Sequence, residues 1–125
     1  MLQLIAIALG GAVGSVARFL AANMVAVQVG TRFPYGTLMV NLVGSFLIGL
    51  MYILIVEKFK MSAEIRGLVM VGFLGAFTTF STFSLELLDM LKSGAVTGAA
   101  LYLLASVIIG VANVWLGMQL GKNLF

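Results

Sequence analysis

The feature that most constrains this chain is a series of four long apolar runs, at residues 2–29, 37–56, 63–91 and 95–121. A helix that crosses a bilayer needs about 20 predominantly apolar residues, so each run is long enough to form one spanning helix. The connections between the runs are short and leave no room for a separate soluble domain. We therefore predict an all-α integral membrane protein in which residues 1–125 form a single four-helix transmembrane domain.

The composition supports a membrane protein and argues against an enzyme. Only 9% of the residues are charged and 62% are hydrophobic, whereas soluble domains carry about 25% charged residues. The chain has no Cys and no His, which excludes disulfides, thiolate and imidazole catalysis and the usual zinc, copper and haem ligands. Its four acidic residues are too scattered for a carboxylate metal site, which leaves backbone carbonyls as ligands for a hard cation. We interpret the net charge of +3 as contact with lipid headgroups rather than with nucleic acid.

The basic residues give only a weak signal for orientation. An even number of spans places both termini on one side of the membrane. That side would carry Lys58, Lys60, Arg66 and Lys122. The other side would carry Arg32 and Lys92, while Arg18 lies inside the first run. The positive-inside rule then favours cytoplasmic termini by a small margin. Such a shallow bias permits insertion in both orientations, and two oppositely inserted copies could meet as an antiparallel dimer.

Polar residues and glycines inside the runs indicate close helix packing and oligomerisation. The isolated polar residues are Arg18, Asn23, Asn41, Ser45, Ser106 and Asn113, besides the group at residues 78–86. They would be costly against lipid, so we expect them to face one another, a partner subunit or water. Gly10 and Gly14 form a GxxxG pair, and Gly44 and Gly49 with Ser45 give the second run a small-residue face. We assign these glycines to helix packing.

The third run contains the stretch GFLGAFTTFSTFSLE, residues 72–86, with five hydroxyl residues, four phenylalanines and one carboxylate. Two glycines followed by two threonines weaken helix propensity there. We predict a break at residues 75–78, near the middle of the membrane, whose freed carbonyls need a cation, water or a neighbouring chain as partner. On an unbroken helix, one face would carry Phe73, Phe77, Phe80 and Ser84.

For any single hydroxyl in this stretch, the simplest expectation is a hydrogen bond to the carbonyl four residues earlier. For Phe73 and Phe77 we expect packing or lipid contact, whereas Phe80 and Phe83 are embedded among hydroxyls. Hydroxyl and amide groups donate hydrogen bonds, and the edge of a phenyl ring is electropositive. With the amide of Asn41 and the positive charge of Arg18, this chemistry favours a path for a small anion that accepts hydrogen bonds.

Three blocks of the sequence resemble the Fluc (CrcB) family of small fluoride channels. They are GGAVGSVARF at residues 10–19, GTLMVNLVGSFLIG at residues 36–49 and GFLGAFTTFSTFSLE at residues 72–86; the fourth run matches only through Tyr102 and Ser106. The resemblance implies a dual-topology homodimer of antiparallel four-helix subunits with two fluoride pores between the protomers. It also implies passive export of toxic cytoplasmic fluoride across a bacterial inner (plasma) membrane, with fluoride ion and membrane lipid as partners.

The resemblance also implies roles for individual residues. Phe80 and Phe83 would be the pore phenylalanines and Asn41 the pore amide. The hydroxyl-rich segment would be Ser81, Thr82 and Ser84, with Arg18 near the aqueous vestibule. Weaker candidates along the route are Thr37, Glu86, Tyr102 and Ser106. The backbone carbonyls of Gly75 and Thr78 from both subunits would hold a structural Na⁺ on the dimer axis.

Three other functions compete with this interpretation. An exporter of the small multidrug resistance type has the same architecture but needs a carboxylate in its first helix, where this chain has Arg18 and no acid. Glu86 could carry protons in a proton-coupled transporter of fluoride or another small solute. A membrane assembly subunit would use the polar stretch only to hold helices together, and would form a dimer without transporting ions.

Overall fold

The computed structural model describes residues 1–124, and every regular element in that part of the chain is a helix. Four helices there are long and apolar enough to cross a membrane: Leu2–Val29, Tyr35–Lys58, Ala63–Lys92 and Val96–Leu124. Their bounds agree with the predicted runs to within a few residues. The prediction of an all-helical chain with four helices long and apolar enough to span a membrane is therefore confirmed for the described residues.

The first span is the single helix α1 (Leu2–Val29), and the others are subdivided. The second consists of α2 (Tyr35–Met51) and the π-helical segment η1 (Tyr52–Lys58). The third consists of α3 (Ala63–Arg66), η2 (Gly67–Leu74), α4 (Gly75–Phe77) and α5 (Phe80–Lys92). The fourth consists of α6 (Val96–Leu104), η3 (Ala105–Ile109) and α7 (Gly110–Leu124).

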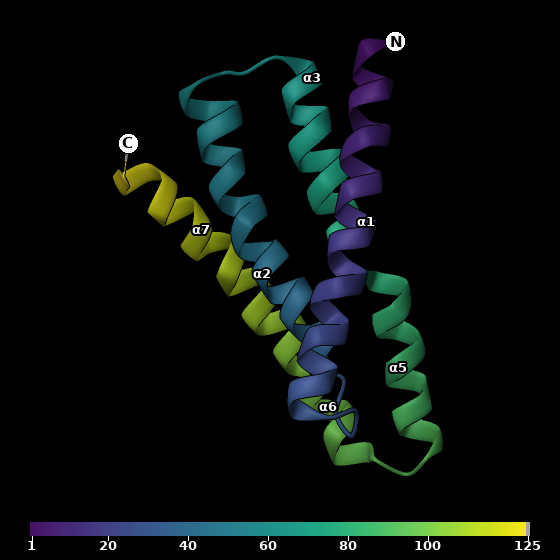
Figure 1. Ribbon diagram of the computed structural model, residues 1–125. Coiled ribbons are helices and arrows are strands. Elements are labelled where there is room, and N and C mark those ends of the chain that lie inside the picture. The colour runs from purple at the N-terminus through teal and green to yellow at the C-terminus, as the bar shows by residue number, and fades with distance from the viewer. Residues whose placement is uncertain (125) are drawn as a thin grey trace.

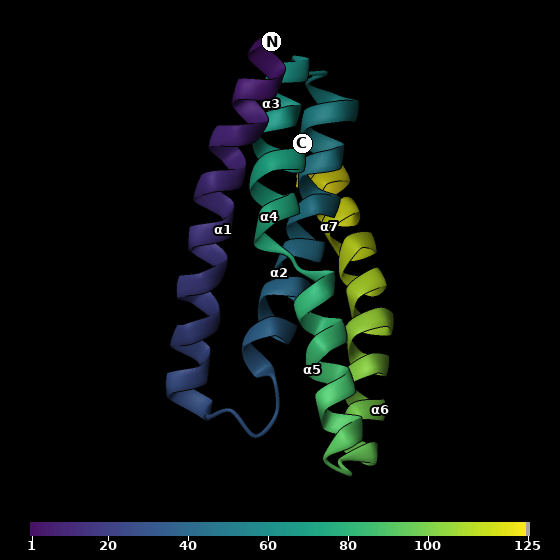
Figure 2. The same ribbon diagram turned by 90° about the vertical axis from the view of Figure 1, so that its right-hand side faces the viewer.

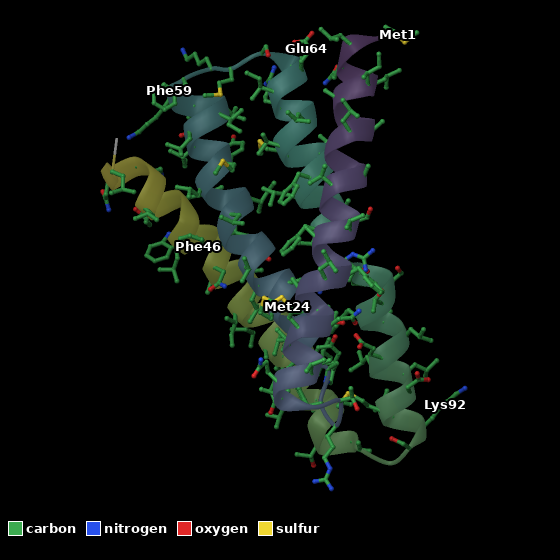
Figure 3. The ribbon with its side chains drawn as sticks, in the orientation of Figure 1. Met1, Met24, Phe46, Phe59, Glu64 and Lys92 are labelled. Atoms are coloured by element: carbon green, nitrogen blue, oxygen red, sulfur yellow. The ribbon has the colours of Figure 1, made fainter. Side chains whose placement is uncertain are left out.

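The connections alternate between the two ends of the helix bundle. Met1, Phe59 and Glu64 lie at one end, and Lys92 lies at the opposite end (Figure 3). The C-terminal part of α7 points toward the end that holds the N-terminus (Figure 1). Both termini therefore lie toward one end of the bundle, as an even number of spans requires.

The third span changes neighbours halfway along its length. Its first half, α3 to α4, packs along α1, whereas α5 packs against α6. The second span packs mainly against α7 and crosses it at an angle (Figure 1). After rotation by 90°, the ribbon steps sideways between α4 and α5 (Figure 2). The bundle thus leaves α5 with few neighbours inside a single chain.

The backbones of α1 and the third span meet along a face of small residues. A Cβ added at Gly10 would collide with the carbonyl oxygen of Leu68, and one added at Gly14 would collide with the carbonyl oxygen of Phe73. Only glycine permits this approach, because the obstructing atoms belong to the backbone and cannot rotate away. The assignment of Gly10 and Gly14 to packing is confirmed.

A second close approach joins α2 to α7. A Cβ at Gly49 would collide with the carbonyl oxygen of Val114, and a Cβ at Gly117 would collide with the carbonyl oxygen of Phe46. Gly44, the other glycine predicted on this face, instead makes room for the side chain of Thr78. These contacts fix α2 between α7 and the middle of the third span.

We expect Gly10→Ala to destabilise the protein by about 1–3 kcal/mol, the usual cost of overpacking. The matched control is Gly11→Ala on the next residue. A Cβ at Gly11 would find the Gly72 carbonyl oxygen at 3.9 Å, an ordinary contact. The measurement is helical circular dichroism of detergent-solubilised protein in increasing fractions of sodium dodecyl sulfate. Equal stability of the two variants would contradict the close backbone contact.

Candidate functional site

The third span is broken at Thr78 and Thr79, where the backbone is extended. Thr78 has φ −91° and ψ 158°, and Thr79 has φ −150° and ψ 121°. β-Branched residues favour this extended conformation. Gly75 keeps helical angles, φ −61° and ψ −38°. The predicted break is therefore confirmed, but it begins at the end of the predicted interval, and the threonines rather than the glycines leave the helix.

The single aromatic face described for an unbroken helix does not apply, because the predicted break is present and its two extended residues change the register. Phe73 and Phe77 stack with ring centroids 5.8 Å apart before the break. Phe80 and Phe83 form a separate tilted pair, also 5.8 Å apart, after it. Phe77 is buried, which confirms its packing role.

Asn41 of α2 hydrogen-bonds to both backbone groups of Thr79 at the break, and so gives the Thr79 N–H the partner that it loses there. Its Oδ1 accepts from the Thr79 N–H at 2.7 Å, and its Nδ2 donates to the Thr79 carbonyl at 3.0 Å. The Thr79 hydroxyl accepts from the Thr82 N–H at 3.3 Å and so caps α5. Thr79 was absent from the predicted site residues, although a threonine preceding a helical run is a known N-cap signal.

Several carbonyls just before the break lose the partners that a continuous helix would give them, among them those of Gly75 and Thr78. The Gly75 carbonyl would accept from the Thr79 N–H, which donates to Asn41 instead. The Thr78 carbonyl would accept from the Thr82 N–H, which donates to the Thr79 hydroxyl instead. These freed carbonyls are the kind of oxygen ligand that a hard cation binds. No cluster of three or more acidic, Cys or His side chains within residues 1–124 offers an alternative metal site.

Arg18 of α1 reaches the same region from the other side. Its Nε donates to the Ala76 carbonyl at 3.1 Å, close to the C-terminal end of α4. A cation there is favourable because the exposed carbonyls of a helix end carry partial negative charge. Arg18 therefore bonds to Ala76, close to the break. It also lines a cavity, which is described below.

The break separates two open cavities. The first, which we call the aromatic cavity, has a volume of about 450 Å³. Its lining includes Asn41, Gly44, Ser45, Gly75, Thr78, Thr79, Phe80, Phe83 and Ser106. Phe83 is buried, whereas 79% of the Phe80 side chain is exposed. The aromatic cavity thus opens on the side of the chain where Phe80 projects.

The second cavity, which we call the charged cavity, has a volume of about 420 Å³. Its lining includes Arg18, Asn23, Arg32, Thr37, Thr79, Thr82, Glu86 and Asp89. Thr79 borders both cavities. Asn23, Arg32 and Asp89 were not among the predicted site residues. Arg32 and Asp89 lie near the ends of their spans, where a charged residue is ordinary and gives no functional signal.

Tyr102 connects the linings of the two cavities. Its hydroxyl donates to Glu86 Oε1 at 3.0 Å, and the Thr37 side chain also hydrogen-bonds to this phenol. The Tyr102 ring lies edge-on to Phe83, with centroids 4.9 Å apart. Tyr102 is fully buried, so the structure brings four predicted site residues, from three spans, into one contiguous group.

The hydroxyl groups within residues 72–86 differ in their hydrogen-bond partners and in their exposure. The Thr78 hydroxyl donates to the Leu74 carbonyl at 3.1 Å, and the Ser84 hydroxyl donates to the Phe80 carbonyl at 2.9 Å. Both bonds confirm the expectation for a membrane helix. Ser81 is exposed, and neither Ser81 nor Ser84 lines the aromatic or the charged cavity.

Ser106 is the unusual hydroxyl. Its Oγ is buried and has no hydrogen-bond partner, and the residue lines the aromatic cavity from the π-helical segment η3. A buried hydroxyl without a partner is costly. Ser106 therefore keeps an unpartnered hydroxyl buried within the wall of this cavity.

Comparison with known proteins identifies similar chains. The family model described as CrcB-like protein, Camphor Resistance (CrcB), matches residues 5–118. A fluoride-specific ion channel FluC from Hydrogenovibrio crunogenus is 51% identical over 125 residues, which cover 100% of this chain and 95% of that protein. The FluC proteins of Magnetococcus marinus and Agrobacterium fabrum are 46% and 45% identical, covering 97% and 100% of this chain and 98% and 100% of those proteins.

We expect Asn41→Ala to destabilise the protein by about 1–3 kcal/mol, because the Thr79 N–H is left without a hydrogen-bond partner. Asn23→Ala is the matched control, since the Asn23 side chain is exposed. The stability of both variants is measured by monitoring their unfolding in detergent with circular dichroism. An Asn41 variant as stable as the Asn23 variant would show that the break does not depend on this amide.

Proposed function

The chain belongs to the CrcB family, and on that premise we propose that it is a fluoride-specific ion channel. It exports toxic cytoplasmic fluoride passively, through two pores at the interface of an antiparallel homodimer. It is not an enzyme. The protein crosses the membrane several times, and we place it in the bacterial inner (plasma) membrane.

The observation that carries this proposal is the chemistry of the aromatic cavity. Its walls contain the amide of Asn41, the buried and unpartnered hydroxyl of Ser106, and the rings of Phe80 and Phe83. Amide and hydroxyl hydrogens and ring edges all present positive charge to an ion. No carboxylate lines this cavity. These side-chain donors suit a small anion.

The open side of the aromatic cavity supports a second copy as its cover. Polar groups and freed carbonyls cannot remain against hydrocarbon, because lipid offers them no hydrogen bonds. A second copy would bring its own Phe80, Ser81 and Ser84 to this surface from the exposed side of α5. The shallow difference in basic residues between the two ends of the bundle favours insertion in both orientations, and hence antiparallel pairing.

The residue groups suggest a route for the ion. Fluoride would leave water in the charged cavity, where Arg18, Thr37 and Thr82 lie. It would then pass the region of Phe83 and Tyr102 to reach Asn41 and Phe80. The donors replace part of the hydration shell, while the lack of Lys and Arg side chains in the lining of the aromatic cavity limits how tightly the anion is held. Chloride is larger and a weaker hydrogen-bond acceptor, so narrow aromatic walls would exclude it.

Nothing in the names of the relatives supports a proton-coupled transporter. The carboxylate of Glu86 accepts a hydrogen bond from Tyr102, which gives it a structural partner without any proton transfer. Fluoride flux through a channel would follow the fluoride gradient and the membrane potential alone.

We also propose that Na⁺ is bound by the Gly75 and Thr78 carbonyls of both subunits, on the dimer axis. These carbonyls have lost their helical partners and line the same open cavity. Bound sodium would neutralise their partial charges and link the two subunits. Its role is structural, and the transported ion is fluoride.

Fluoride efflux from liposomes, followed with a fluoride-selective electrode in the presence of valinomycin, tests the function. We expect rapid fluoride release and no chloride release in a parallel trial. Phe80→Ile and Phe83→Ile should each lower the flux roughly tenfold or more, because they keep bulk but remove the polarised ring edge. Phe46→Ile, on α2 but outside both cavities, is the control. Trapped fluoride in liposomes that contain folded wild-type dimer would refute the channel.

Dual topology can be tested by labelling, because the chain has no native Cys. Single cysteines are placed at opposite ends of the bundle, as Lys60→Cys and Ser93→Cys. An impermeant maleimide added outside spheroplasts should label roughly half of each variant, as a weak charge bias predicts. Full labelling at one end with none at the other would establish a single orientation and exclude the antiparallel dimer.

Sodium binding predicts a cation-specific gain in stability. A ligand present at 100 times its dissociation constant stabilises the folded state by about 2.7 kcal/mol. We therefore expect a higher melting temperature of the detergent-solubilised dimer in Na⁺ than in K⁺ at equal ionic strength. Identical melting curves at saturating concentrations of both salts would argue against the site.

A further inference from the structure

Arg18 continues a regular series of contacts along one face of α1. Gly10, Gly14 and Arg18 are four residues apart, so they lie on the same side of the helix. The first two approach the carbonyl oxygens of Leu68 and Phe73. The third reaches the Ala76 carbonyl with its Nε at 3.1 Å. The face that begins with two glycines therefore ends with a long side chain at the point where the third span breaks.

The Ala76 carbonyl needs this donor because of the break. In a continuous helix it would accept from the Phe80 N–H, but Phe80 is the first residue of α5, beyond the two extended threonines. The Arg18 guanidinium supplies the missing hydrogen bond and places a positive charge at the negative end of a helix. Asn41 of α2 likewise supplies a partner for the Thr79 N–H, without a charge.

The charge of Arg18 alone does not explain its position. The charged cavity is lined by two arginines, Arg18 and Arg32, and by two carboxylates, Glu86 and Asp89. With all four ionised, two positive and two negative charges sum to zero. The field that Arg18 would exert on an incoming anion is therefore offset by acidic side chains in the same cavity.

We propose that Arg18 is a positioning residue that clamps the end of α4 through its Nε–H. By fixing the Ala76 carbonyl, it orients the neighbouring carbonyls of Gly75 and Thr78 and the aromatic cavity that they line. The consequence for ion flux rests on the proposed fluoride channel. The clamp itself is a property of the folded chain and can be measured without fluoride.

Two substitutions separate the clamp from the charge. Arg18→Lys keeps the charge but lacks the Nε–H and the planar fork of the guanidinium. Replacement of Arg18 by citrulline keeps the Nε–H and the planar shape but removes the charge. Arg32→Gln, which removes a positive charge from the same cavity without contacting α4, is the matched control.

The first readout is hydrogen–deuterium exchange of the amides at residues 76–80 in the detergent-solubilised dimer. Loss of a hydrogen bond to a charged group should speed exchange roughly tenfold or more. We expect this acceleration in the Arg18→Lys variant and not in the citrulline or Arg32→Gln proteins. Unchanged exchange in Arg18→Lys, or equal acceleration in Arg32→Gln, would overturn the clamp.

The second readout is fluoride flux at low and high ionic strength. The clamp predicts that Arg18→Lys lowers flux roughly tenfold at both, and that the citrulline protein stays within about threefold of the wild type. A role through charge alone predicts the reverse, with a citrulline defect that salt masks. That reverse pattern would overturn the proposal.

If the Arg18→Lys variant does not assemble, the clamp is tested by comparing amide exchange in the wild type and in the citrulline protein. Wild-type exchange in the citrulline protein supports the clamp, and accelerated exchange refutes it. If no variant, wild type included, passes fluoride, the proposed function fails while the exchange experiment still tests the clamp.

Discussion

Backbone groups inside a bilayer have no water to bind, so a broken helix must find its hydrogen bonds in neighbouring side chains. In this protein the break at Thr78 and Thr79 receives Arg18 from α1 and Asn41 from α2. Both donors must sit within about 3 Å of their acceptors. The close glycine contacts of α1 with the third span, and of α2 with α7, make this approach sterically possible. The hydrogen bonds at the break therefore depend on the close helix packing that the glycines allow.

The groups that the chain does not satisfy lie together on one surface. Four residues that carry such groups line the aromatic cavity: Gly75 and Thr78 with their freed carbonyls, Ser106 with its unpartnered hydroxyl and Phe80 with its exposed ring. Elsewhere in the polar stretch, Thr78 and Ser84 turn their hydroxyls back to the backbone. In ordinary helix packing, polar groups find partners within the chain. Several polar groups without partners on one surface instead indicate a site for an ion and a partner subunit.

The sequence predicted what depends on local chemistry and failed where the outcome depends on distant contacts. Apolar length identified the spans, and β-branched threonines after glycines identified the break. The shared face described for residues 73–84 held only for an unbroken helix, and the break that the sequence also predicted removes that condition. The bonds of Arg18 to Ala76 and of Asn41 to Thr79 join residues 58 and 38 positions apart, and no local pattern encodes such pairs. The family resemblance suggested these two residues as pore elements, while their contact with the break required the structure.

The position of the break within its span bears on the proposed dimer. The helical residues before it, in α3, η2 and α4, number 4, 8 and 3, a total of 15, and α5 after it has 13. Two parallel copies would align their breaks at equal depth wherever the break fell in the span. Two antiparallel copies align them only if each break lies near mid-depth. A break that divides the span almost equally therefore meets a requirement that only antiparallel pairing imposes. It would also bring the freed carbonyls of both copies to the same depth, where one cation could contact them all.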